Sequence, residues 1–275
     1  MSPVNELHDY RTYLQQGEKS TATVEKYIRD VCHFQTYLQD RTLCKTETIA
    51  YKEYLVSRYA PSSVNSMLAS LNSFLHFIGK PDCIVKQLKV QRQIFCSETK
   101  ALTLKEYQRL VKAAGNARIS LVLQTICGTG IRVSELQAIT VEAVREGKAV
   151  INCKNKTRVI FLPSSLQKLL SQYIKKAGLL AGAVFQTKRG KPLNRSNIWR
   201  EMKALCRKAD VLPEKVFPHN LRHLFARIFY GIEKDIVRLA DLLGHSNINT
   251  TRIYTMDSGY QHMARLEEIQ KILVT

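Results

Sequence analysis

The sequence predicts a mainly α-helical protein with a small β-sheet, in which an all-α helical bundle precedes an α+β domain. Apolar residues recur three and four positions apart in successive segments of the 275 residues, which is the period of amphipathic helices. Two short apolar runs, 149–153 and 158–162, flank a polar turn at 154–157, which is typical of a β-hairpin. Because so little of the chain has strand character, helices dominate the predicted fold.

Four helical segments make up the predicted first domain, at residues 1–80. Their apolar spacing places them at 4–16, 21–38, 45–59 and 64–78. The fourth is the clearest, and Pro61 and Gly79 mark its two ends. Four amphipathic helices in this length predict a small all-helical bundle.

Residues 81–98 lack a clear helical or strand period, and we interpret them as an interdomain linker. Their basic residues include Lys89 and Arg92. Two interpretations are equally open: these side chains follow a DNA backbone, or the segment is a solvated loop.

The predicted second domain covers residues 99–275. It opens with Thr103 and, three residues later, Glu106, which is the pattern of a helix capping box. Further helices fit 104–114, 118–127, 133–140, 164–177, 195–209, 218–230 and 233–242. An apolar spacing from Met263 to Leu273 predicts a last helix in the tail.

Charge points to a polyanionic partner. Lys and Arg (42) exceed Asp and Glu (23) by 19. Residues 1–98 hold 12 basic and 10 acidic side chains, or +2, which leaves 30 and 13, or +17, for residues 99–275. Nucleic acid is the leading interpretation, and an inert basic surface is the alternative.

Cysteine usage and hydropathy predict a cytoplasmic protein without a membrane segment. The seven cysteines are odd in number and form no Cys-x-x-Cys, which favours reduced thiols over a disulfide framework. No apolar stretch approaches the ~18–20 residues of a membrane-spanning helix. His219 and His223 are spaced as metal ligands sometimes are, but they lack a third clustered ligand, and we expect no metal site.

Two stretches of the second domain combine glycine, arginine, glutamate, histidine and tyrosine residues. In the first, the glycines of Gly128-Thr-Gly130 precede Arg132 and Glu135, at what we expect to be a helix start, where free N–H groups favour anions. The second stretch contains His219-x-x-Arg222-His223, Leu243-Gly244-His245 and Tyr254.

Spacing predicts that the second stretch forms one pocket. His219 and Arg222 lie three residues apart, on one face of a helix. His245 and Tyr254 converge only if a helix begins after His245, and Ser246 or Asn247 is a suitable N-cap for it.

Taken in this order, the motifs resemble those of the tyrosine recombinases of the phage-integrase family, in their short Xer-like form. The resemblance covers residues 99–275 by motif, and the helical pattern before them is compatible with the family's SAM-like core-binding domain. It implies a site-specific DNA recombinase. Protomers clamp double-stranded DNA between two domains, and four of them exchange strands through a Holliday junction.

The resemblance also implies roles for the motif residues. Tyr254 is the nucleophile; because a phenol is mostly protonated at neutral pH, it needs a proton acceptor, for which His219 matches the family pattern. Arg132 and Arg222 clamp the phosphate with their planar, permanently charged forks. His245 donates a hydrogen bond to the phosphate. The 3′-phosphotyrosyl bond preserves the energy of the cleaved bond, so no metal or nucleotide cofactor is expected.

The general acid and the supporting residues follow from the same resemblance. The family supplies a Lys from a β-hairpin turn, and the corresponding turn here is one residue shorter. Lys154 is favoured and Lys156 stays the alternative, with Lys156 and Arg158 otherwise contacting phosphates. Glu135 orients the segment that begins at Arg132, and His223 supports the site from behind.

Two other functions stay open, as does the mode of assembly. A type IB topoisomerase-like enzyme shares the chemistry, and a DNA-binding accessory protein shares the affinity for DNA. A tail at 262–275 that docks on a neighbouring protomer favours the recombinase. The sequence names neither the DNA site nor the task, which is dimer resolution, integration and excision, or inversion.

Overall fold

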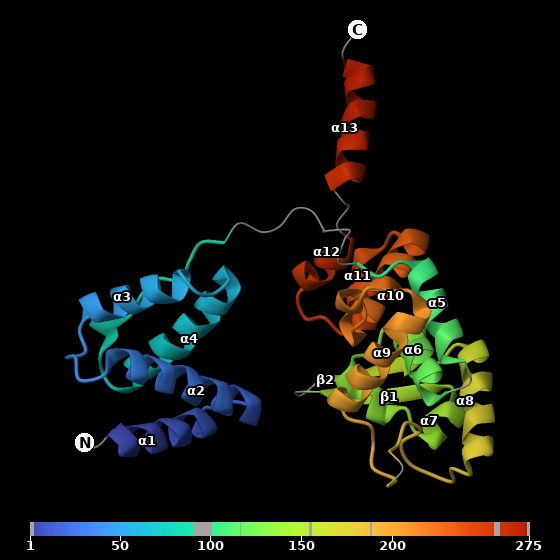
Figure 1. The fold of residues 1–275 in the computed structure, drawn as a ribbon, viewed down its shortest axis with the longest axis horizontal. Coiled ribbons are helices and arrows are strands. Elements are labelled where there is room, and N and C mark those ends of the chain that lie inside the picture. Colours follow the sequence, from blue (N-terminus) through green and yellow to red (C-terminus); the bar gives the residue numbers. More distant parts are fainter. Residues whose placement is uncertain are drawn as a thin grey trace. The chain divides into compact units, whose positions relative to one another are not determined.

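The computed structural model describes residues 3–90, 101–115, 117–153, 156–187, 189–255 and 259–273. The chain divides into two compact units, residues 1–92 and 93–275, and each is described by itself (Figure 1). Throughout the described part, helices dominate and the strands form one two-stranded sheet, as the sequence predicts. No helix in these ranges is long and apolar enough to cross a membrane.

The first unit is a bundle of four helices. These are α1 (Pro3–Gln16), α2 (Thr21–Leu38), α3 (Lys45–Val56) and α4 (Pro61–Phe77). Ser20 caps α2 by accepting a hydrogen bond from the Thr23 amide, and Pro61 occupies the first turn of α4, where its missing N–H costs nothing. The apolar stripe of α4, including Leu68 and Leu71, is buried against the other helices. The bundle that the apolar spacing predicts is therefore confirmed.

A charged pair lies inside this bundle. The Asp30 carboxylate on α2 is 7% exposed. It accepts hydrogen bonds from the Lys26 ammonium, one helical turn earlier, and from the Ser70 hydroxyl of α4 at 2.8 Å. One positive and one negative group thus neutralise each other where α2 packs on α4.

Residues 81–88, the first part of the predicted linker, pack on α4, whereas 91–98 lie outside the described residues. A short 3₁₀ helix, η1 (Pro81–Cys83), is followed by an extended stretch held by two side-chain amides of α4. Asn72 exchanges hydrogen bonds with the backbone of Val85 at 2.8 and 3.1 Å, and Asn65 does the same with Leu88 at 2.7 and 2.9 Å. Residues 81–88 are therefore part of the helical unit.

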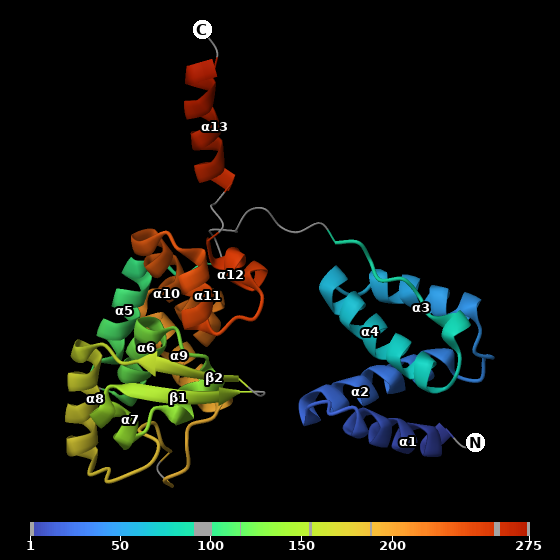
Figure 2. The ribbon, with the colours of Figure 1, turned by 180° about the vertical axis from the view of Figure 1, so that it is seen from behind.

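The second unit carries the sheet and the remaining helices (Figures 1 and 2). In order these are α5 (Leu104–Ala114), α6 (Arg118–Thr129), η3 (Val133–Ala138), α7 (Val141–Glu146), β1 (Lys148–Cys153), β2 (Lys156–Phe161), α8 (Ser164–Ala177), α9 (Arg195–Ala209), η4 (Pro213–Lys215), α10 (Pro218–Glu233), α11 (Ile236–Leu243), α12 (Ile248–Thr255) and α13 (Gly259–Leu273). The predicted capping box at the start of α5 is present in full, because Thr103 and Glu106 cap each other's backbone.

The sheet is an antiparallel hairpin in which Val150 pairs with Val159 and Cys153 with Lys156. Strand β2 thus begins two residues earlier than predicted. Ile151 and Ile160 face the core, whereas Asn152, Thr157 and Val159 face outward. Arg158 shares the inward face with Ile160, which has consequences for the site.

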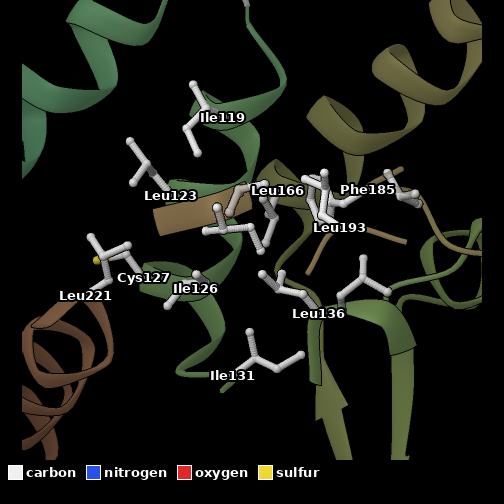
Figure 3. Close-up of a cluster of buried hydrophobic side chains, with 14 of the residues drawn as sticks. Ile119, Leu123, Ile126, Cys127, Ile131, Leu136, Leu166, Phe185, Leu193 and Leu221 are labelled. Carbon is white, nitrogen blue, oxygen red and sulfur yellow. The ribbon is translucent and has the colours of Figure 1, made fainter. Parts of the chain in front are cut away.

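The end of α6 sets the position of Arg132. Gly130 ends the helix with φ +65°, and a Cβ there would lie 2.4 Å from the Phe225 ring, so only glycine fits. Ile131 then enters the apolar core with Ile126 and Leu136, as Figure 3 shows. Because its neighbours on both sides are anchored, Arg132 leaves the core at a fixed point.

Candidate active site

Helix α10 presents three polar side chains on one face. His219, Arg222 and His223 occupy positions i, i+3 and i+4, and Pro218 fixes the first turn. Arg222 is 2% exposed, whereas His219 lies at the surface and His223 is half-buried. The predicted shared face of His219 and Arg222 is confirmed.

Tyr254 reaches this face from α12. Helix α11 ends at Gly244, and the Asn247 side chain accepts a hydrogen bond from the Asn249 amide at 2.9 Å, so α12 begins after His245 as predicted. The Tyr254 ring is 4% exposed. Its centroid lies 4.2 Å from that of His223, 5.6 Å from that of His245 and 5.9 Å from that of His219.

The Arg222 side chain joins α10 to the ends of α6 and α11 through hydrogen bonds. Its guanidinium donates to the Gly130 carbonyl at 2.5 Å, to the Leu243 carbonyl at 2.7 Å and to His245 Nε2 at 2.9 Å. The Tyr254 hydroxyl lies near the same guanidinium. Burial, with the charge of nearby Arg132, lowers the pKa of Arg222 to about 10. The guanidinium is still charged at neutral pH but is held in a site that disfavours its charge.

The partners of His245 define its tautomer. Because the Arg222 guanidinium can only donate, Nε2 of His245 accepts, and the ring proton is on Nδ1, which donates to the Thr251 hydroxyl at 2.8 Å. Burial and then the charges of Arg222 and Arg132 lower the pKa of His245 to about 4. His245 is therefore neutral at physiological pH.

Glu135 binds two arginines at once. Its Oε1 accepts from the Arg132 guanidinium at 2.9 Å, and its Oε2 accepts from the Arg132 amide at 2.9 Å and from Arg158 at 2.6 Å. Burial alone would raise the pKa of Glu135, but the hydrogen bonds from Arg132 and the charge of Arg158 lower it, so the carboxylate stays ionised. The predicted orienting contact between Glu135 and Arg132 is present, on a 3₁₀ helix rather than an α-helix.

Histidines 219 and 223 are also held neutral. Partial burial and the charges of Arg222 and Arg132 lower the pKa of His219, and burial with the neighbouring His219 lowers the pKa of His223 to about 3. The two rings contact each other edge to face at 4.5 Å. A neutral imidazole at the surface of the cluster is able to accept a proton.

A cavity of about 460 Å³ opens beside the cluster. Its wall includes Arg132, Arg222 and His219 on one side and residues of α9 on the other. From α9 come Arg195, Trp199 and Lys203, with the Lys203 ammonium over the Trp199 ring. Acidic side chains are absent from the described residues that line it. The arrangement suits a polyanion with flat, stackable groups.

The remaining predicted residues lie elsewhere or cannot be placed. Lys154 and Arg92 lie outside the described residues; Lys156 is paired in β2, and its side chain is likewise outside them. Lys89 is exposed in the stretch that follows η1. The structure differs from the prediction at Arg158, whose donors engage protein groups instead of facing solvent.

Sequence reasoning missed Thr251 and the α9 residues Arg195, Trp199 and Lys203. Thr251 lies three residues before Tyr254, on the same helical face, so this spacing could have identified it from the sequence. The α9 residues belong to no motif, and the only signal in the sequence is that basic and aromatic residues occur together on one predicted helix.

The chain belongs to the phage integrase family. The family's catalytic domain matches residues 100–259, and the phage integrase N-terminal SAM-like domain matches residues 7–80. Among curated relatives, the tyrosine recombinase XerA of Pyrococcus horikoshii is 29% identical over 98% of this chain and 94% of its own length. Tyrosine recombinase XerD of Shewanella oneidensis is 28% identical over 92% and 90%.

Solved structures share the fold. A λ integrase dimer bound to a COC′ core site has a TM-score of 0.75 at 18% identity, covering 94% of this chain and 97% of that one. The XerH recombinase bound to its difH substrate has a TM-score of 0.70 at 18% identity, covering 100% and 85%. The predicted family and fold class are confirmed by these matches.

Proposed function

We propose that the protein is a site-specific DNA recombinase of the tyrosine type. The observation that carries this proposal is the position of Tyr254, whose buried ring lies among three neutral histidines and whose hydroxyl lies near Arg222. A nucleophile, a proton acceptor and two cationic clamps thereby lie within one cluster.

Phosphate binding is the first step. The scissile phosphodiester occupies the cavity edge, where Arg132 and Arg222 neutralise its non-bridging oxygens. The anion takes up donors that Arg222 now gives to His245 and to backbone carbonyls. Burial is the main cause of the lowered pKa of Arg222, and repulsion from Arg132 adds to it. Because a bound phosphate offsets both effects, it stabilises the charged guanidinium.

Cleavage follows by attack of the Tyr254 oxygen on phosphorus. A P–O bond to Tyr254 forms, the bond to the 5′-oxygen breaks, and the phenolic proton passes to the neutral imidazole of His219. Once Arg222 has turned to the anion, the ring proton of His245 moves from Nδ1 to Nε2, which donates to the phosphate while the Thr251 hydroxyl donates to Nδ1. The products are a 3′-phosphotyrosyl bond and a free 5′-hydroxyl.

The leaving 5′-oxygen takes a proton from the hairpin lysine. Lys154 is the favoured donor and Lys156 the alternative, as the sequence argument leaves them. Substrates with a 5′-bridging phosphorothiolate need no acid, because a thiolate is a good leaving group. The acid is the lysine whose Ala variant regains cleavage on the sulfur substrate, and the other lysine's variant serves as the control.

Strand exchange needs assembly on double-stranded DNA. The helical unit, residues 1–80 by the predicted boundary, clamps the DNA face opposite the catalytic unit, and four protomers exchange strands through a Holliday junction. Tail residues 262–275 link the protomers, which fits the exposure of Met263, Ile269, Ile272 and Leu273 along α13. Lys89 contributes a phosphate contact on the way between units.

Covalent trapping tests the chemistry. The protein is incubated with DNA from the flanks of its own gene, nicked so that the cleaved end diffuses away. We expect a denaturation-resistant adduct for wild type and none for Tyr254→Phe, and the position of the adduct maps the site. Tight sequence-specific binding without an adduct would instead favour the accessory-protein function, and an adduct retained in the variant would assign the nucleophile to another tyrosine.

Deletion of 262–275 tests the assembly. The truncated protein is expected to bind one half-site as wild type does but to lose the four-protomer complex in a gel-shift series. Unchanged assembly would exclude the tail as the link between protomers.

A further inference from the structure

Arg158 joins three segments of the catalytic unit. It projects inward from β2, and its side chain is 14% exposed. One terminal nitrogen donates to the Leu242 carbonyl in the last turn of α11 at 2.8 Å, and the other donates to Glu135 on η3 at 2.6 Å. Strand, 3₁₀ helix and α-helix therefore meet at one guanidinium.

On both sides, Arg158 contacts residues that adjoin proposed phosphate ligands, Arg132 on one side and His245 on the other. On one side, the Glu135 carboxylate that Arg158 holds also holds the Arg132 guanidinium and amide. On the other side, Arg158 lies against Gly244, where a Cβ would approach its Cδ to 2.7 Å. The Gly244 carbonyl accepts from Arg132 at 3.3 Å, and the next residue is His245.

We propose that Arg158 is a positioning residue for catalysis, which fixes Arg132 through Glu135 and His245 through the turn at Gly244, and that it does not bind DNA phosphate. The inference rests on the proposed recombinase function. Two of its five N–H groups donate to Leu242 and Glu135, and the Nε–H is buried without an acceptor among the described residues. Because the side chain is only 14% exposed, a phosphate would have to compete with these protein acceptors to reach the terminal nitrogens.

The position of Arg158 on the hairpin gives this contact a second consequence. The hairpin also carries the general-acid lysine at its turn, two to four residues before Arg158. A single side chain thus fixes the strand that bears the acid relative to the helix end that bears His245. Because the acid and the phosphate clamps act on oxygens of the same phosphodiester, their relative placement affects the rate of cleavage.

Two substitutions separate positioning from phosphate contact. Arg158→Met keeps the aliphatic stem against Gly244 and removes every donor. Arg158→Lys keeps the charge but reaches only one of two partners that lie in different directions. A lysine replaces a phosphate contact well as a point charge, so the two roles predict different results for Arg158→Lys. Arg195→Ala, from the exposed cavity wall, removes the same charge and calibrates the loss of a phosphate contact.

The measurements are the salt dependence of DNA affinity and the rate of adduct formation at saturating DNA. For Arg158→Met we expect wild-type affinity and salt slope, with cleavage slowed roughly hundredfold, because a misplacement near 1 Å costs about that much. Arg158→Lys is expected to recover only part of the rate. Wild-type DNA affinity in either variant reports that the protein is folded.

The opposite pattern would overturn the proposal. A phosphate contact at Arg158 lowers the salt slope of Arg158→Met by about 0.9, as expected for Arg195→Ala, and lets Arg158→Lys cleave at the wild-type rate. A wild-type protein that binds its site but forms no adduct would defeat the recombinase function itself. The salt slopes would then still decide whether Arg158 contacts phosphate.

Discussion

Two charged clusters, one in each unit, differ in how their charges balance. In the helical unit, Lys26 and Asp30 pair within the α2–α4 contact, and the sum is zero. In the catalytic site, Arg132 and Arg158 bind one carboxylate, Glu135, and the charges of both act on nearby Arg222, which leaves three minus one, or +2. Breaking a balanced pair destabilises a fold, whereas a surplus of partly buried positive charge marks the place where an anionic ligand is expected.

The largest effect that this comparison predicts is at Arg222. Its charge is unfavourable in the free protein, as its lowered pKa shows, and becomes favourable only beside an anion. Arg222→Gln is expected to slow adduct formation by roughly 10²–10³-fold. Its melting temperature is expected to stay near that of wild type, because relief of repulsion with Arg132 offsets the lost hydrogen bonds. A large fall in melting temperature with unchanged cleavage would make Arg222 a structural residue.

The balanced pair predicts the reverse. Asp30→Asn leaves the Lys26 ammonium without its counter-ion, although Lys26 still reaches solvent. We expect the unfolding free energy of the helical unit to fall by about 1–3 kcal/mol. The rate of adduct formation at saturating DNA is expected to be unchanged. Denaturant unfolding measures the free energy, and a single-turnover assay on the same preparation measures the rate. A slowed chemical step in Asp30→Asn would contradict the assignment of this pair to stability alone.

A smaller effect is expected at Thr251. Its hydroxyl is the partner of His245 Nδ1 and can also reverse the bond, donating to Nδ1 when Nε2 must carry the proton toward phosphate. Thr251→Val removes that option and is expected to slow cleavage about tenfold, the equivalent of one hydrogen bond. Thr251→Ser keeps the hydroxyl and serves as the matched control. Equal rates for Val and Ser would show that the hydroxyl contributes nothing to cleavage.

The smallest effect is in the pH dependence of stability. The pKa of His223 falls from its ordinary value near 6.5 to about 3 in the folded protein, so the unfolded chain binds the proton more readily. The corresponding stability is complete above about pH 6.5 and is lost as the pH falls toward 3.

His223→Gln removes this contribution, whereas His245, which behaves in the same way, remains. Melting temperatures measured from pH 7 to pH 4.5 are expected to fall less steeply in the variant than in wild type. Parallel curves would mean that His223 is protonated at its ordinary pKa in the folded protein.

Local signals in the sequence predicted most of the fold. Thr103 and Glu106 form their capping box, and Asn247 opens α12, because both depend only on neighbours within one turn. Helix α7, of six residues, is too short to show a period, and the 3₁₀ form of 133–138 has the same polar pattern as an α-helix. The packing of 81–88 on α4 depends on two asparagine side chains, which resemble ordinary helix-surface residues in sequence.

The site was predicted where motif residues lie on one helix, and less well where it depends on tertiary partners. The shared face of His219 and Arg222 follows from spacing. Arg158 was expected to contact phosphate from the resemblance of the hairpin turn to the family's. Its inward direction follows from the register of β2, which begins at Lys156, and the sequence did not reveal that Oε2 of Glu135, which accepts from the Arg132 amide, also accepts from Arg158.

The surplus charge is tested most directly by a substrate that lacks the matching charge. A methylphosphonate at the scissile position replaces one charged oxygen by a neutral methyl group and leaves the Tyr254 reaction intact. If the Arg222 guanidinium serves to neutralise phosphate, the Arg222→Gln defect should shrink from roughly 10²–10³-fold to about tenfold or less on this substrate. A defect of the same size on both substrates would contradict the account, because Arg222 would then act on something other than the phosphate charge.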